Sequence, residues 1–165
     1  MKRLLILLLS APCIAAGQAA EIKLDKYTGS KTASFKSASA LMTMSQGAPH
    51  ERHYFAVRSV TPEKPDVNSI FLIFKSQTWR YLKCSNVDWL IDGKPIKFKE
   101  IIQDRNVQRG TVTEGFILQS DRSQMASIAK AGLVEIRVCN DEYVLSKEAI
   151  QGTGDVVLAD LSQKP

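Results

Sequence analysis

The chain has 165 residues and a mass of 18.3 kDa; 44% of its residues are hydrophobic, 24% are charged, and its formal net charge is +5. This length fits one domain. The composition is close to the globular average, which excludes wholesale disorder, collagen and coiled coils.

The first twenty residues predict a secretory signal peptide. Lys2 and Arg3 precede an apolar run over residues 4–9, and small residues follow up to Ala20. Such a run is too short to span a bilayer, and the small residues mark a cleavage site after Ala19 or Ala20. Pro12 beside Cys13 argues against lipidation. We therefore expect a cleaved leader over residues 1–20 and an exported protein, periplasmic or secreted, with no transmembrane segment.

Removal of the leader leaves 20 basic and 17 acidic residues, a net charge of +3. An excess of this size is not the footprint of a nucleic-acid-binding protein, so nucleic acid is not an expected partner. A mature chain of about 145 residues buries roughly 70% of its unfolded surface. We therefore expect a core that needs neither a metal nor a cofactor for its stability.

The N-terminal part of the mature chain predicts short strands and turns. Residues 21–27 alternate apolar and polar and predict a half-buried strand, whereas residues 29–34 are small and polar and predict a loop. Residues 39–45 predict a weak strand, and residues 47–49 a turn. Residues 53–60 are rich in β-formers and predict a strand that ends before Pro62 and Pro65.

The middle of the chain predicts a buried strand and a hairpin. Residues 70–74 are continuously apolar, which is typical of a central strand covered on both faces. Residues 86–91 and 95–102 flank Asp92 and Gly93, and this dipeptide is a strong hairpin signal. Residues 111–119 predict a further strand that follows Gly110 and has a bulge at Gly115.

The clearest helix is predicted over residues 122–131. Asp121 is its expected N-cap, Gln124 stands where a capping-box partner would, and Gly132 is expected to end the helix in the left-handed conformation. Residues 133–139 and 142–145 predict two more strands. Alternation directs Val134, Ile136 and Val138 into the core, which points Cys139 the other way.

The C-terminal residues predict two short helices. Ser146 is the expected cap of a helix over 147–151, which Gly152 and Gly154 interrupt, and Asp155 is the expected cap of a second helix through Leu161. Tight turns and few crossovers indicate an α+β fold, mainly an antiparallel sheet of about seven or eight strands with one or two helices packed on one face. With no repeat or linker, we expect a single globular domain over residues 21–162.

Cys84 and Cys139 are the two cysteines left after removal of the leader. In an oxidising compartment an isolated pair is expected to form a disulfide. Two separate buried thiols are the alternative. A catalytic thiol would need a histidine nearby, and both histidines are distant in sequence.

Catalytic motifs are weak in this sequence. His50 and His53 are three residues apart after Pro49, whereas the zinc-protease motif spaces its histidines by four on a helix. Four acidic residues are candidates for general acid–base work: Glu100, Asp104, Glu114 and Asp121. Solvated faces and helix caps are the favoured explanation for these residues, and no metal or cofactor motif is present.

The strongest interaction signal is a basic and aromatic segment over residues 75–99, with a net charge of +4. Aromatic side chains among cations suit a patch that docks an anionic partner. The alternative is the wet face of an antiparallel sheet. The expected binding residues are Trp79, Arg80, Tyr81, Lys94, Lys97 and Lys99. Of the two tryptophans, Trp89 is expected in the core and Trp79 on the surface.

The order of a leader, residues 79–81, the Asp92-Gly93 hairpin, the helix over 122–131 and the strands over 134–138 and 142–145 resembles small exported bacterial domains of uncharacterised function. These motifs are generic features of sheets, so no site residue can be transferred. We expect a non-enzymatic envelope protein that binds another protein or an anionic polymer such as lipopolysaccharide or peptidoglycan. The alternative is a small envelope hydrolase whose site includes His50 or His53.

Overall fold

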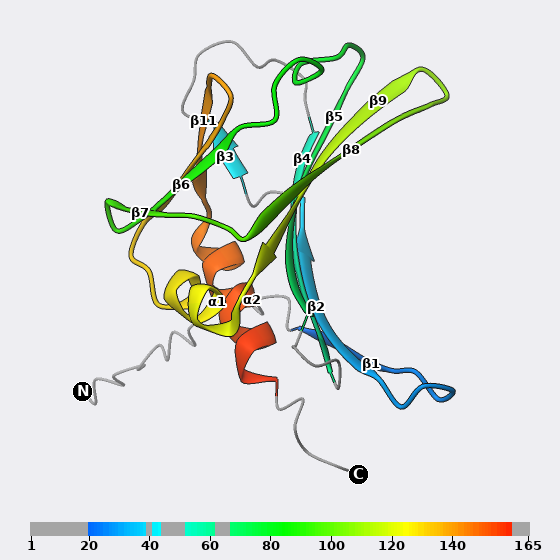
Figure 1. The fold of residues 1–165 in the computed structure, drawn as a ribbon, viewed down its shortest axis with the longest axis vertical. Coiled ribbons are helices and arrows are strands. Elements are labelled where there is room, and N and C mark those ends of the chain that lie inside the picture. Colours follow the sequence, from blue (N-terminus) through cyan, green and yellow to red (C-terminus); the bar gives the residue numbers. More distant parts are fainter. Residues whose placement is uncertain (1–19, 39–40, 44–51, 62–66, 160–165) are drawn as a thin grey trace, which may run out of the picture.

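The structure, a computed structural model, describes residues 20–38, 41–43, 52–61 and 67–159. The expected leader, the turn at 47–49, His50, Pro62 and Pro65 lie outside these residues, as does the end of the chain from residue 160. The fold is α+β, as predicted, and consists of two antiparallel sheets and two helices (Figure 1).

The larger sheet has six strands in the order β1-β2-β4-β5-β9-β8, and we call it the large sheet. Its strands are β1 (Glu21–Leu24), β2 (Lys31–Ser37), β4 (Arg52–Thr61), β5 (Val67–Ser76), β8 (Glu100–Gln108) and β9 (Thr111–Ser120). The small sheet has five strands in the order β3-β11-β10-β6-β7. Its strands are β3 (Leu41–Thr43), β6 (Val87–Ile91), β7 (Lys94–Ile96), β10 (Val134–Val138) and β11 (Asp141–Leu145).

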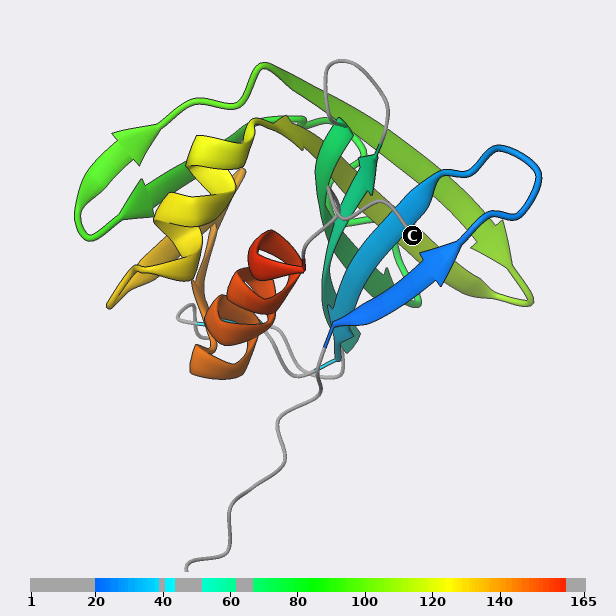
Figure 2. The ribbon, with the colours of Figure 1, turned by 90° about the horizontal axis from the view of Figure 1, so that it is seen from below.

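Both helices, α1 (Arg122–Ala129) and α2 (Lys147–Leu158), lie on the side of the large sheet that faces the small sheet (Figures 1 and 2). α2 packs on β2 and β4, and α1 packs on α2. Within the described residues, no helix covers the opposite side of the large sheet, which we call its outer face (Figure 2). No described helix is long and apolar enough to cross a membrane.

The core lies between the two sheets because alternate residues of each strand point inward. On the large sheet, Phe55, Ile70 and Leu72 are fully buried, whereas their chain neighbours Phe71 and Ile73 are only half-buried on the outer face. β5 is therefore the interior strand that the sequence predicts, between β4 and β9. The expectation that it is covered on both faces is wrong, because Phe71 and Ile73 on its outer face are only half-buried and no described helix packs on that face.

Two N-terminal predictions are wrong. The predicted loop over 29–34 is largely strand β2, whose Ala33 and Phe35 are buried beneath α2. The predicted half-buried strand is β1, which is exposed along its whole length, with Ile22 and Leu24 at 59% and 60% exposure. β1 is one of the two edge strands of the large sheet and pairs only with β2. The alternation of apolar and polar residues therefore predicted the strand, but it did not predict whether another element packs on it.

The Asp92-Gly93 hairpin is confirmed. Both residues have positive φ, 48° and 75°, and they join β6 to β7. The predicted strand over 95–102 is divided, because β7 ends at Ile96 and β8 begins at Glu100 in the other sheet. Residues 97–99 are thus a crossover between the sheets. Together with β2, this division gives more strands than expected. The bulge predicted at Gly115 is absent, since its pairing with β5 and β8 is continuous.

The helix predicted over 122–131 is confirmed, with the capping box of Asp121 and Gln124 formed. The helix ends at Ala129, with Lys130 as its C-cap. Gly132 is not in the left-handed region, and its amide donates to Asp92 Oδ1 at 3.0 Å. Ser146 caps α2 as predicted.

The two helices predicted after Ser146 are one continuous helix, which neither Gly152 nor Gly154 interrupts. Gly152 lies against the ring of Phe35, and a Cβ at this position would be 2.4 Å from a ring carbon. The glycine therefore allows α2 to approach the large sheet closely.

Candidate anion-binding site

A buried polar network ties the segment between β5 and β6 to both sheets. Arg80 donates from Nε and Nη2 to the Asp141 carboxylate at 2.5 and 2.7 Å. The Tyr81 hydroxyl donates to Asp141 Oδ2 at 2.9 Å and lies 2.6 Å from the Tyr143 hydroxyl. The Glu114 carboxylate accepts the backbone N–H groups of Arg80 and Tyr81, both at 2.8 Å. We call these five residues the clamp.

The electrostatics of the clamp follow from these contacts. The hydrogen bond from Arg80 lowers the pKa of Asp141, and the bond from Tyr81 acts in the same direction. Burial raises the pKa of Tyr81, and its hydrogen bond to Tyr143 adds to the effect. Glu114 is almost completely buried, at 1% exposure, and each of its oxygens accepts a backbone N–H. These groups hold a loop in place, which is a structural role.

The disulfide between Cys84 and Cys139 is confirmed, with the two Cα atoms 6.1 Å apart. The structure buries Val134, Ile136 and Val138, as predicted. Cys139 lies beyond the end of β10, so the alternation along this strand does not set its direction. It lies in the two-residue turn between β10 and β11 with φ of 58°. The turn redirects the chain, so that Cys139 reaches Cys84 beside the clamp.

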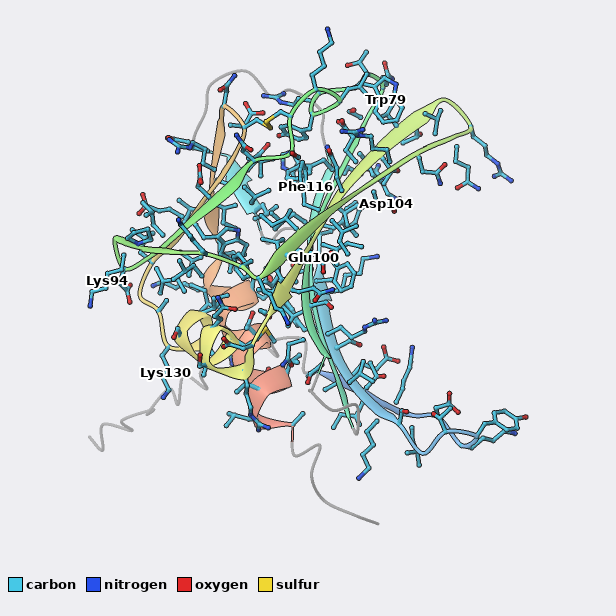
Figure 3. The ribbon with its side chains drawn as sticks, in the orientation of Figure 1. Trp79, Lys94, Glu100, Asp104, Phe116 and Lys130 are labelled. Atoms are coloured by element: carbon cyan, nitrogen blue, oxygen red, sulfur yellow. A yellow bond between two sulfur atoms is a disulfide. The ribbon has the colours of Figure 1, made fainter. Side chains whose placement is uncertain are left out.

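The six residues expected to form one basic and aromatic surface are divided by the structure. Trp79 is exposed at 39%, but Tyr81 is buried at 1% and Arg80 is engaged by Asp141. Lys94 opens β7, and Lys97 and Lys99 are exposed on the crossover between the sheets. Figure 3 shows Trp79 and Lys94 at opposite sides of the molecule. Of the tryptophans, Trp89 is in the core, as expected.

The candidate acid–base residues are also separated. His53 is 8% exposed and packs edge-on against the rings of Phe74 and Tyr143. Glu114 belongs to the clamp and Asp121 caps α1. Glu100 and Asp104 lie on the edge strand β8. The described residues contain no group of three or more histidine, cysteine, aspartate or glutamate side chains that could hold a metal.

The outer face of the large sheet carries an open hollow of about 970 Å³ where β4, β5 and the β8–β9 hairpin meet. Among the residues that the structure describes, its lining contains three cations, one tyrosine and several hydroxyl and amide side chains, and no carboxylate. The lining residues are Arg52, Tyr54, Lys75, Ser76, Gln77, Thr78, Gln108, Arg109, Thr111 and Thr113. We call this site the basic hollow.

The register of the sheet assembles the basic hollow. Arg52 of β4 pairs with Lys75 of β5, which pairs with Thr113 of β9, so the three side chains form one row across the outer face. Arg109 is in the β8–β9 turn with φ of 52°. Residues from three strands and a turn therefore converge on one site.

Two lysines of this region lie over an aromatic ring. The ammonium groups of Lys36 and Lys75 lie 5.2 and 5.3 Å from the ring centroid of Tyr54. In the part of the chain that the structure describes, no carboxylate forms an ion pair with Arg52, Lys75 or Arg109.

Sequence reasoning missed the basic hollow because its residues are far apart along the chain. The alternation within β4 and β5 does place Arg52, Tyr54 and Lys75 opposite the buried positions of their strands. Bringing the strands together, however, requires the pairing of β5 with β4 and β9, which a single sequence does not reveal. In comparisons with protein families, curated proteins and solved structures, the chain matches none of them.

Proposed function

We propose that the protein acts by binding an anionic partner of the cell envelope at the basic hollow, and not by catalysis. The observation that carries this proposal is the set of three cations, Arg52, Lys75 and Arg109, in a hollow whose described lining residues include no carboxylate. Cations that share one concave site raise the local concentration of anions and favour their binding.

The other lining residues support the same function. Ser76, Thr78, Thr111 and Thr113 offer hydroxyl groups, and Gln77 and Gln108 offer amides. Such groups hydrogen-bond phosphate, carboxylate or sugar oxygens. An envelope location is supported by the predicted leader and by the disulfide, which is typical of oxidising compartments.

The experiment compares two triple variants with equal loss of charge. One replaces the hollow cations, Arg52→Gln, Lys75→Gln and Arg109→Asn, where asparagine suits the positive φ of residue 109. The other replaces Lys94, Lys97 and Lys99 by glutamine and tests the surface expected from sequence. Binding of fluorescently labelled inorganic polyphosphate is measured by anisotropy at low salt.

We expect the hollow variant to lose at least about tenfold in affinity, because three charge-assisted contacts disappear. The affinity of the control variant should change by less than about twofold, because the three lysines it has lost attract the polyphosphate only at long range. Equal binding by wild type and the hollow variant would refute the proposal, as would a greater loss in the control.

A further inference from the structure

An apolar band lies directly beside the basic hollow on the outer face of the large sheet. Its members come from four adjacent strands and are half-buried or, for Ile102, 41% exposed. They are Ala56, Phe71, Ile73, Ile102 and Ile117. Tyr54 joins the two features, because it lines the hollow and pairs with Ile73.

The position of the band follows from register. Ala56, Phe71, Ile117 and Ile102 are successive partners across β4, β5, β9 and β8. Strands are about 4.8 Å apart, so this row extends about 14 Å. The hydrocarbon core of a bilayer is roughly 30 Å thick, and one acyl chain spans about half of it. The row is therefore about as long as one acyl chain.

Cations border the band on the side of β2, β4 and β5. The Arg58 guanidinium lies 5.9 Å from the ring centroid of Phe71, and the ammonium groups of Lys36 and Lys75 lie over Tyr54. Two acidic residues of this face, Glu100 and Asp104, are on the other side, on edge strand β8. A third, Glu21, is on edge strand β1, in the row of Ser34 and Arg58, and forms an ion pair with Lys23 at 3.2 Å. Basic side chains that rest on aromatic rings beside an apolar strip are typical of surfaces that contact anionic lipid.

We infer that the anionic ligand is a lipid, with its phosphate in the basic hollow and an acyl chain on the apolar band. This inference rests on the proposed function and assigns its ligand class. A soluble polyanion would use the cations but would leave the adjoining apolar strip exposed to water. An anionic lipid matches both the charge of the hollow and the hydrophobicity of the band.

The test measures co-sedimentation with phosphatidylglycerol–phosphatidylcholine vesicles and with vesicles of phosphatidylcholine alone. The band variant replaces Ile102 and Ile117 by threonine, which preserves strand propensity. The matched control replaces Ile22 and Leu24 of β1, two exposed apolar residues outside the band, by threonine. Polyphosphate binding is measured for each protein, and circular dichroism verifies folding.

We expect wild type and the β1 control to bind the anionic vesicles and not the neutral ones. The band variant should bind them about tenfold more weakly, because apolar contact is lost, while retaining its affinity for polyphosphate. Equal vesicle binding by the band variant and the β1 control would overturn the lipid assignment. Polyphosphate binding that depends on the hollow, without vesicle binding, would also overturn it and would favour a soluble anionic polymer, leaving the proposed function intact. Failure to bind either probe would refute both.

Discussion

The clamp and the basic hollow both use arginine, but they use it in opposite ways. In the clamp, Arg80 donates two hydrogen bonds to Asp141 at 2.5 and 2.7 Å, in surroundings where both side chains are mostly buried. In the hollow, Arg52 and Arg109 line open space and form no ion pair within the described residues. A paired, buried charge fixes the fold, whereas an unpaired, accessible charge is available for binding. Substitutions in the clamp should therefore change stability, and substitutions in the hollow should change binding.

The largest effect on stability is expected from removal of the disulfide beside the clamp. Replacing both Cys84 and Cys139 by alanine frees a loop with a sequence separation of 55 residues. The chain-entropy model gives a loss on the order of 4 kcal/mol in the free energy of unfolding. Urea unfolding of the wild type and the double variant measures this loss. A change below about 1 kcal/mol would mean that the clamp alone holds residues 77–86.

The Asp141→Asn variant tests the clamp itself. Loss of the carboxylate removes the ion pair and the two hydrogen bonds that Asp141 forms with Arg80, and we expect a loss of about 3 kcal/mol in the free energy of unfolding. The matched control is Asp88→Asn, which removes the partner of Arg137 in a pair whose side chains are 55% and 61% exposed. The control should change stability much less. Equal effects would contradict a special role for the clamp.

The pH dependence of stability gives an independent test of the Asp141 interaction. Arg80 lowers the pKa of Asp141 in the folded state below the unfolded value of about 3.9. The carboxylate therefore stabilises the fold above that pH, and this contribution is lost as the pH falls through the folded pKa. The difference in stability between wild type and Asp141→Asn should narrow below about pH 4. If the difference in stability between the two proteins stayed constant from pH 7 to pH 2.5, it would contradict the lowered pKa of Asp141.

Two glycines in one helix provide a comparison within the core. At Gly152, an added Cβ would be 2.4 Å from a ring carbon of Phe35, whereas at Gly154 its closest neighbour would be Ala129 Cβ at 3.6 Å. We expect Gly152→Ala to lower the free energy of unfolding by about 2 kcal/mol. Gly154→Ala should raise it by about 0.5 kcal/mol through helix propensity. Thermal unfolding of both variants measures the difference, and the same sign for both would contradict the packing described.

The smallest effects on stability are expected in the hollow. Arg52→Gln and Lys75→Gln should each change the free energy of unfolding by less than about 0.5 kcal/mol, because both side chains are exposed and neither forms an ion pair with a residue that the structure describes. Chemical unfolding at pH 7 measures this. A loss of more than about 1.5 kcal/mol would show that these cations stabilise the fold, and the contrast with the clamp would disappear.

Local sequence signals predicted much of the fold but little of the site. The capping box of Asp121 and Gln124, the Asp92-Gly93 hairpin and the alternation of Val134, Ile136 and Val138 are properties of adjacent residues, and all are confirmed. β2 was missed because its composition is typical of a loop, and only packing under α2 explains its burial.

The basic segment shows the same limit in the candidate site. The pattern of charges along the chain places Arg80 and Tyr81 in one group with Lys94. In the structure, Arg80 and Tyr81 belong to the buried clamp, whereas Lys94 lies in β7. The hollow needs Arg52, Lys75 and Arg109 together, and strand pairing over long sequence distances supplies that contact. No local pattern encodes it.

The most direct test of the central claim is the salt dependence of polyphosphate binding. Each ionic contact contributes about −0.7 to the slope of log affinity against log salt concentration for a flexible polyanion. Replacement of Arg52, Lys75 and Arg109 should therefore make the slope shallower by about 2, while replacement of Lys94, Lys97 and Lys99 leaves it at the wild-type value. An unchanged slope in the first variant, or a shallower one in the second, would contradict the assignment of binding to the basic hollow.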